Sequence, residues 1–136
     1  MALEELISKE ENVEKILERI LKERVKLIQE VSEKYVHIRK ELARKLDNFT
    51  KILLYLAGKK AWELIEEKKT GKKIEYWIKP KEIEKNLRLS GGSVRPVLKQ
   101  MKERKLIDCK QKTYRINFAG ILELEERIKK YEEEKK

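Results

Sequence analysis

The first 57 residues contain no glycine and no proline, and this unbroken stretch constrains the fold more than any other feature of the chain. The first glycine is Gly58 and the first proline is Pro80. Apolar residues recur along the stretch at steps of mostly three and four, which is the helical period. They are Leu3, Leu6, Val13, Leu17, Ile20, Leu27, Val31, Tyr35, Ile38, Leu42, Leu46 and Phe49. The pattern predicts one helix over residues 2–46, roughly 65–70 Å long.

A solitary solvated helix of that length has nowhere to bury its apolar stripe. It therefore needs a partner, either its copy in a second chain or the C-terminal helix. The successive steps of four from Leu27 through Val31 to Tyr35 act like a stutter, which locally unwinds a left-handed supercoil. Two shorter helices folded back near Arg24 are the alternative, although no turn residue supports them. We expect residues 1–47 to form a helical, coiled-coil dimerisation arm.

The following residues, 48–117, carry the turn signals of a small domain. Asn48 or Thr50 is suited to cap its first helix, and Pro80 fits the first position of a second helix. Ser90 or Ser93 is available to cap a later helix. We expect Pro96 in the first turn of that later helix. In order, the predicted elements are a helix ending near residue 68, a turn over 68–73, a strand over 74–78, a helix from residue 80, a turn over 89–93, a helix over 93–104, and strands over 106–110 and 113–117.

The chain ends in a predicted helix over residues 118–136. Its apolar residues Ile121, Leu124, Ile128 and Tyr131 are spaced by three, four and three, which indicates a docking stripe. We expect this helix to pack against the N-terminal helix, within one chain or across a dimer, and to contribute to dimerisation.

The excess positive charge lies in one segment. Residues 48–117 hold 19 Lys and Arg against 8 Asp and Glu, whereas residues 1–47 hold 11 of each and residues 118–136 hold 5 against 6. A basic block between nearly neutral flanks, in a chain of net charge +10, indicates a middle that binds a polyanion and ends that bind protein. Lys and Glu number 49 and Asn and Gln only 7, a bias typical of hyperthermophiles.

The order helix, short strand, helix, tight turn, helix and hairpin resembles the winged helix-turn-helix domain. The resemblance is carried by residues 77–87, 89–98 and 101–107 and covers about half of the chain. It implies a mainly α fold with a small β wing, of the α+β class, that binds duplex DNA. The long flanking helices resemble the dimerisation arms of small archaeal winged-helix DNA-binding proteins.

The third helix of this segment presents cations on the face opposite its apolar residues. An arginine such as Arg95 can contact a guanine edge with two hydrogen bonds, and Ser93 with the turn amides can hold a phosphate at the positive helix end. In a winged helix the hairpin tip commonly contacts phosphate or the minor groove. The DNA-contact residues predicted in full are Lys79, Lys81, Ser90, Ser93, Arg95, Lys99, Lys102, Lys110 and Lys112.

Other residues have a structural and a functional interpretation. Trp62, Tyr76 and Trp77 could stack on single-stranded bases, but their apolar context favours core packing. His37 has no metal-ligand partners and is interpreted as a surface or seam residue. Cys109 alternates with Ile107 toward the core, where a small hydrophobe is favoured over a redox sensor. The lysines of residues 68–73 form either a phosphate clamp or a surface loop.

The sequence offers no support for an enzyme, because it lacks a Gly-rich phosphate loop, a His/Cys cluster and a Ser-x-Gly nucleophile elbow. One His and one Cys leave no zinc motif and no intrachain disulfide, so neither metal nor cofactor is expected. No small-molecule ligand is evident. The chain has no apolar run near 18 residues and an acidic N-terminus, so we expect a cytoplasmic protein without a membrane segment.

We therefore expect a homodimeric, sequence-selective duplex DNA-binding protein, with transcription regulation as the leading use. Nucleoid packaging or maintenance of plasmid or viral DNA is a close alternative. A winged-helix scaffold for protein interactions and an RNA-binding protein also remain open. Salt dependence and sequence preference separate these uses.

Overall fold

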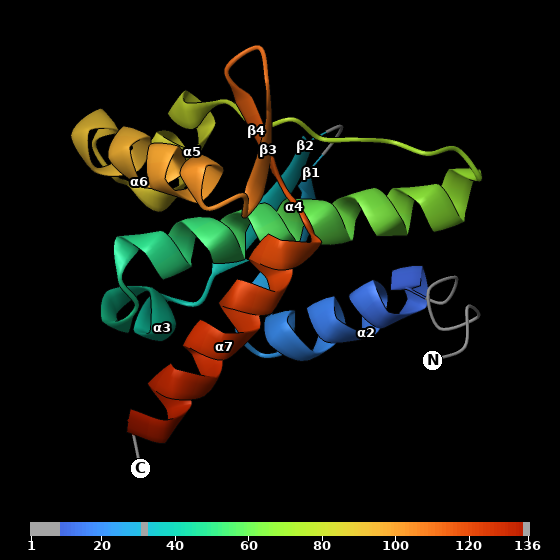
Figure 1. Cartoon of the computed structure of the whole chain (residues 1–136). Helices are drawn as coiled ribbons and strands as arrows, with labels where there is room; N and C mark the ends of the chain where they lie inside the picture. Colours follow the sequence, from blue (N-terminus) through green and yellow to red (C-terminus); the bar gives the residue numbers. More distant parts are fainter. Residues whose placement is uncertain (1–8, 31–32, 135–136) are drawn as a thin grey trace.

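The computed structural model describes residues 9–30 and 33–134 of the chain. The fold is mainly helical, with two small antiparallel hairpins, as expected for the α+β class (Figure 1). The elements are α2 Lys9–Leu21, β1 Val25–Glu30, β2 Glu33–Ile38, α3 Lys40–Lys45, α4 Asn48–Thr70, α5 Pro80–Leu87, α6 Gly91–Glu103, β3 Ile107–Lys110, β4 Thr113–Ile116 and α7 Phe118–Glu134.

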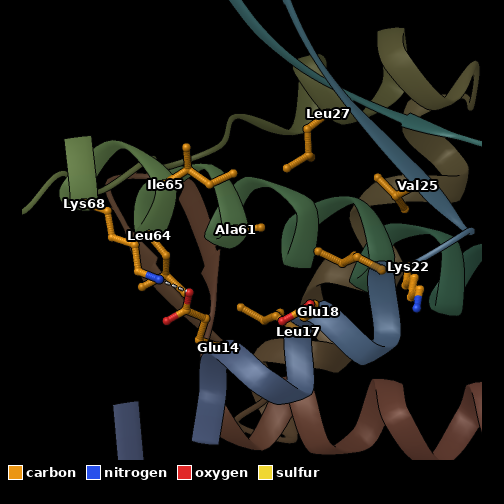
Figure 2. A pocket seen from close by; sticks show the side chains of 11 residues that line it. Glu14, Leu17, Glu18, Lys22, Val25, Leu27, Ala61, Leu64, Ile65 and Lys68 are labelled. Carbon is orange, nitrogen blue, oxygen red and sulfur yellow. Dashed lines mark hydrogen bonds and ion pairs between the residues drawn. The ribbon is translucent and has the colours of Figure 1, made fainter. Parts of the chain in front are cut away.

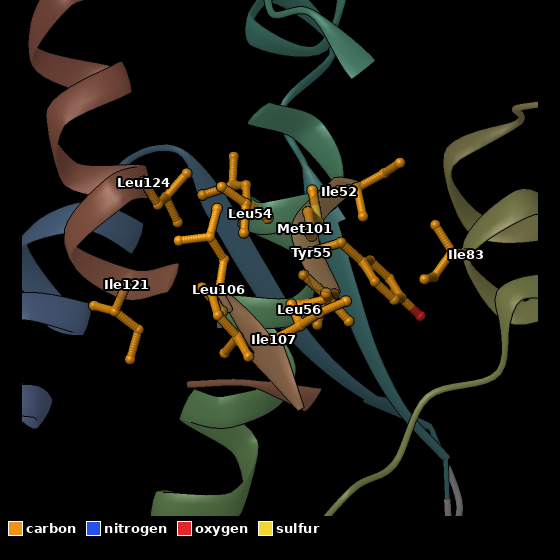
Figure 3. Close-up of a cluster of buried hydrophobic side chains, with 14 of the residues drawn as sticks. Ile52, Leu54, Tyr55, Leu56, Ile83, Met101, Leu106, Ile107, Ile121 and Leu124 are labelled. Atoms are coloured by element: carbon orange, nitrogen blue, oxygen red, sulfur yellow. The ribbon is translucent and has the colours of Figure 1, made fainter. Parts of the chain in front are cut away.

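Helix α4 is the centre of the molecule, and six consecutive residues from Ile52 to Ala57 are at most 1% exposed. A helix that is buried on every side must be surrounded by other elements, and α4 contacts both hairpins and helices α2, α5, α6 and α7. Side chains from several of these elements meet in one apolar cluster (Figure 3). The cap is Asp47, whose Oδ1 accepts a 2.9 Å hydrogen bond from the Thr50 amide, not Asn48 or Thr50 as predicted.

The predicted uninterrupted helix over residues 2–46 is wrong. Helix α2 ends at Leu21, and an antiparallel hairpin occupies residues 25–38 before the short helix α3 begins. The alternative of two helices folded back is also wrong, although the chain does break near Arg24. Of the predicted stripe, Leu3, Leu6 and Val31 lie outside the described residues.

The helical interpretation failed because a step of four residues fits both repeat patterns, since it lies close to one helical turn and equals two strand periods. Residues four apart share a face on a strand, where the period is two, as well as on a helix. The break itself is set by Glu23, which adopts a left-handed conformation with φ 64° and carries no sequence signal for it. β-branched and aromatic residues in 25–38 favour strands, and burial of one hairpin face on α4 selects them.

The β1–β2 hairpin packs closely on α4 through β2. Gly58 permits this approach, because a Cβ at its position would lie 2.5 Å from Val36 Cγ1. The buried Trp62 donates a 3.0 Å hydrogen bond from Nε1 to the Tyr35 carbonyl, and Lys34 pairs with Glu66 at 3.6 Å. The segment predicted to be a coiled-coil dimerisation arm thus contributes to the common core.

Helix α7 begins at Phe118, as predicted, and its apolar stripe is covered within the same chain. Ile121, Leu124 and Ile128 are buried, and α7 contacts α2 and α4. An ion pair between Arg19 and Glu125 connects α2 with α7, and a second one joins Arg24, in the turn after α2, to Glu132 of α7. The predicted packing of the terminal helices on each other is therefore confirmed within one chain, while their role in dimerisation stays a prediction.

A buried ion pair, which the sequence did not reveal, attaches β4 to α4. The side chain of Glu63 is 3% exposed and accepts hydrogen bonds from Arg115 Nε at 2.7 Å and from the Tyr76 amide at 2.7 Å. The hydrogen bond to Glu63 raises the pKa of Arg115. This contact holds the extended segment before α5 and the β3–β4 hairpin on the same side of α4.

In the described parts of the chain, no helix has the length and apolar character to cross a membrane.

Candidate nucleic-acid interface

Helix α6 presents its predicted cations to solvent because its other face is fixed in the core. Val94, Leu98 and Met101 are at most 1% exposed, and their spacing of four and three leaves Arg95, Lys99 and Lys102 exposed. These three side chains therefore lie on the outer surface of the helix.

The start of α6 differs in detail from the prediction. Ser90 is the N-cap, and its Oγ accepts a 3.2 Å hydrogen bond from the Ser93 amide. The helix begins at Gly91, which places Pro96 in the second turn and not the first. Because proline has no amide hydrogen, the carbonyl of Gly92 lacks the partner that a regular helix would supply.

Helix α5 lies beside α6 and begins with Pro80 at its first position, as predicted. Ile83 is fully buried and anchors it. Arg88 takes a left-handed conformation at the C-cap with φ 55°, and the Leu89 amide donates a 2.9 Å hydrogen bond to the Glu84 carbonyl. The chain then turns sharply into α6.

The β3–β4 hairpin projects from the molecule beside α5 and α6 (Figure 1). Its strands match the predicted hairpin, with Ile107 opposite Ile116 and Lys110 opposite Thr113. The predicted strand over residues 74–78 is reduced to a single bridge, in which Ile78 and Tyr114 exchange two 2.8 Å backbone hydrogen bonds. That bridge brings the start of α5 next to the hairpin.

Helix α5, helix α6 and the β3–β4 hairpin together enclose a groove of about 580 Å³. It is lined by Lys79, Pro80, Lys81, Arg95, Leu98, Gln111, Lys112, Thr113 and Tyr114. Four of the nine residues are cations, and none of the described lining residues is acidic. The positive end of the α5 dipole points to the same side. The groove therefore concentrates positive potential from four side chains that come from three separate segments of the sequence.

The carboxylate nearest to these lysines in sequence is turned away from the groove. Glu82 accepts a 2.6 Å hydrogen bond from Tyr55 Oη and pairs with Lys59 at 3.0 Å. Burial of the Tyr55 side chain and its hydrogen bond to Glu82 raise the pKa of Tyr55. Asn86 Nδ2 donates a hydrogen bond of 3.1 Å to the same hydroxyl. The network occupies the one acidic group in the first turn of α5.

The structure brings together four of the nine predicted contact residues: Lys79, Lys81, Arg95 and Lys112. Lys99 and Lys102 extend the basic surface along α6 but do not line the groove. Lys110 lies over the Trp77 ring at 5.8 Å from its centroid. Ser90 and Ser93 lie at the start of α6, with their hydroxyl oxygens 3.1 Å apart.

Sequence reasoning missed Gln111, Thr113 and Tyr114 as groove residues. Tyr114 is half-buried and lines the groove together with Arg95. Burial raises the pKa of Tyr114, Cys109 adds to the effect, and the positive charge of Arg95 opposes it. The bridge between Ile78 and Tyr114, which no local sequence signal indicates, places Tyr114 beside the start of α5.

The remaining candidates have mixed outcomes. Trp62 is in the core, as predicted, whereas Trp77 is half-buried and lies outside the core cluster. His37 is exposed, on a strand and not on a helix. Cys109 is exposed, so its predicted orientation toward the core is wrong.

The lysine-rich turn predicted over residues 68–73 is partly helical, because α4 continues to Thr70 and is capped by Gly71 at φ 73°. It lies at the opposite end of α4 from α5 and α6 (Figure 1). Within residues 9–30 and 33–134, no three His, Cys, Asp or Glu side chains are grouped in a way that could hold a metal ion.

Comparison of the chain with protein-family models, with curated proteins and with solved structures found no match.

Proposed function

We propose that residues 48–117 form a winged helix-turn-helix domain that binds duplex DNA. In this proposal α5 and α6 are the helix-turn-helix, α6 is the recognition helix, and β3–β4 is the wing. The predicted sequence selectivity and transcription-regulatory use belong to the same proposal. It rests on the geometry of this segment and on its charge, since no related protein supports it.

The single observation that carries the proposal is the composition of the groove. Three separate elements contribute four exposed cations to it, and the described lining contains no carboxylate. A solvated surface of this chain would normally mix both signs, because Glu and Lys alternate along most of its helices. Concentrated cations on the walls of a concave surface match a phosphate backbone.

The groove assigns different tasks to its side chains. Lys79 and Lys81, beside the α5 N-terminus, are placed to contact phosphates and fix the orientation of the duplex. Arg95 projects from α6 and is the residue suited to bidentate contact with a guanine edge. Lys112 at the hairpin tip contacts the flanking backbone.

The test is duplex binding by fluorescence anisotropy across a salt series. A variant with Lys79, Lys81, Arg95 and Lys112 each changed to Gln should lose most of its affinity. The magnitude of the slope of log K against log salt should fall by about three, because Lys79, Lys81 and Lys112 are the phosphate contacts and each contributes about 0.9. A control with the same charge loss carries Gln at Lys15, Lys40, Lys129 and Lys130, which are exposed and do not line the groove. Equal losses in both variants would refute the groove as the interface.

Sequence selectivity has its own test. Arg95→Gln should cost about 1–3 kcal/mol on a preferred site and relax discrimination there, whereas Lys112→Gln should weaken all duplexes alike. Equal losses from both variants on every duplex would identify an architectural binder. The same competition assay should include RNA and single-stranded DNA. If the wild-type chain binds no duplex DNA, the protein-interaction scaffold and the RNA-binding protein are the alternatives that remain.

A further inference from the structure

Among the residues that the structure describes, no strand lies beside the outer edge of β1. The ladder to β2 extends by a 3.0 Å hydrogen bond from the Arg39 amide to the Arg24 carbonyl, so backbone groups of Lys26 and Ile28 also point toward β2. Those of Leu27 and Gln29 then point outward. In the described parts of the chain, no residue outside the hairpin hydrogen-bonds to the backbone of β1. Such an edge pairs readily with another strand.

An apolar groove of about 530 Å³ lies against this edge (Figure 2). Its lining comes from α2, β1 and α4, and no residue of β2 belongs to it. The apolar lining residues are Leu17, Leu21, Val25, Leu27, Ala61, Leu64 and Ile65. An ion pair between Glu14 and Lys68 crosses one end. A strand added to β1 would cover this groove and remove its apolar surface from water.

The sequence of β1 is complementary to itself in antiparallel register. Outward-pointing backbone groups must face each other, and pairing Leu27 with the partner subunit's Gln29 meets that condition. The same register places Lys26 opposite the partner subunit's Glu30 and Ile28 opposite the partner subunit's Ile28. A register shifted by two residues in either direction would instead place Ile28 opposite a charged residue, Lys26 or Glu30. Ile28 is one of two large hydrophobic side chains in the described chain that are exposed, at 39%.

We propose that two copies of the chain associate through the edges of their β1 strands, with the two-fold axis at Ile28. The result is one continuous antiparallel sheet in which each copy covers the apolar groove of the other. The proposal supplies an interface for the homodimer that the sequence analysis predicts. It does not depend on DNA binding, so an oligomer measurement can fail independently of the binding test.

The first experiment is sedimentation velocity of the full chain across a concentration series, with far-UV circular dichroism as a check on folding. Ile28→Asp places two carboxylates across the axis and should raise the dimer dissociation constant at least about tenfold. The matched control is Leu122→Asp, because Leu122 is the other exposed large hydrophobic, at 40%, and lies on α7. It should leave the dimer intact. A wild-type chain that is monomeric throughout the series, or a control that dissociates instead, overturns the proposal.

A charge exchange tests the register. Lys26→Glu alone or Glu30→Lys alone places like charges opposite each other and should weaken the dimer about tenfold. The double variant Lys26→Glu/Glu30→Lys restores opposite charges across the axis and should recover most of the affinity. Additive losses in the double variant would contradict this register.

A cross-link tests the axis itself. Opposite residues of a non-hydrogen-bonded antiparallel pair have Cα atoms about 4.5 Å apart, within the range of a disulfide. Ile28→Cys in a Cys109→Ser background should therefore form a covalent dimer on mild oxidation, because removal of the exposed Cys109 leaves one cysteine per chain. Leu122→Cys in the same background should not. Equal cross-linking of both variants would show random collision and would overturn the axis.

Discussion

The two hairpins of this molecule share an antiparallel topology and differ in what they leave exposed. The β1–β2 hairpin lies along α4 and leaves a strand edge beside an apolar groove. The β3–β4 hairpin is anchored to α4 by the Glu63–Arg115 pair and projects its tip into solvent next to a basic groove. One hairpin thus presents backbone groups and apolar surface, whereas the other presents cations.

The comparison indicates that a shared hairpin architecture does not determine which kind of molecule each hairpin can bind. An exposed edge with self-complementary charges suits a second copy of the same strand, because hydrogen bonds and ion pairs form symmetrically. A tip that carries cations beside a basic helix suits a polyanion, because its gain comes from phosphate neutralisation. The chemistry of the exposed side chains separates the two roles.

The largest expected effect comes from breaking the attachment of the β3–β4 hairpin. Glu63→Ala leaves Arg115 without its buried partner and should lower the free energy of unfolding by about 3–5 kcal/mol. The matched control is Glu75→Ala, which removes a partner of the same arginine at 3.7 Å that is 45% exposed and should cost at most about 1 kcal/mol. Urea denaturation monitored by circular dichroism measures both. Equal losses would show that the hairpin is not held through Glu63.

The next effect tests the contact of the other hairpin with α4. Gly58→Ala inserts a methyl group 2.5 Å from Val36 Cγ1 and should destabilise the fold by about 1–3 kcal/mol. If residues 25–38 were helical and away from α4, the same change would stabilise the helix by about 1 kcal/mol. The sign alone distinguishes the two structures. The double variant Gly58→Ala/Val36→Ala should lose less than the sum of the single changes, because the methyl then has room.

The part of the fold that local signals specify could be predicted. Pro80 marks the start of α5, Ser90 caps α6, and the apolar steps of α7 place its buried face. The β1–β2 hairpin could not be predicted in the same way. Its apolar spacing fits both periods, and the choice depends on burial against Gly58 and Trp62, which are distant in the sequence.

The residues of the candidate site could likewise be predicted only in part, where a local sequence signal exists. The lysines and Arg95 could be chosen by type and helical face. That Lys79 and Lys112 line one groove depends on the Ile78–Tyr114 bridge, which joins segments far apart in the chain. The inward turn of Glu82 depends on Tyr55 in α4. Such contacts carry no local sequence signal, because each involves a partner that only the packed fold supplies.

A smaller effect concerns strain at the basic tip. Gln111 and Lys112 adopt φ values of 49° and 62°, which residues other than glycine adopt at a cost of roughly 1–2 kcal/mol each. Gln111→Gly and Lys112→Gly should therefore each stabilise the fold by about 1 kcal/mol. Only Lys112→Gly should also weaken duplex binding and lower the salt slope by about one. Thermal unfolding and anisotropy measure the two effects. Equal binding losses would show that tip geometry, and not the cation, contributes the affinity.

The smallest effect compares a tyrosine on each hairpin. The pKa of Tyr35 is raised first by its hydrogen bond with Glu33, whereas that of Tyr114 is raised first by burial and opposed by Arg95. Glu33→Gln should therefore lower the pKa of Tyr35 alone, and Arg95→Gln should raise that of Tyr114 alone. NMR titration of the ring carbons measures both values.

These shifts also set the sign of a pH dependence. A phenol whose pKa is higher in the folded state contributes stability that is complete below the unfolded pKa of about 10 and is lost as the pH rises through the folded value. Tyr35→Phe and Tyr114→Phe should each make the alkaline fall in stability less steep.

Bound DNA should change the pKa of only one of these two tyrosines. Phosphates near Arg95 disfavour a phenolate, so a bound duplex should raise the pKa of Tyr114 and leave Tyr35 unchanged, because the basic groove includes Tyr114 and no residue of β2. A shift at Tyr35 instead would place the nucleic acid on the β1–β2 hairpin and reverse the roles assigned to the two hairpins.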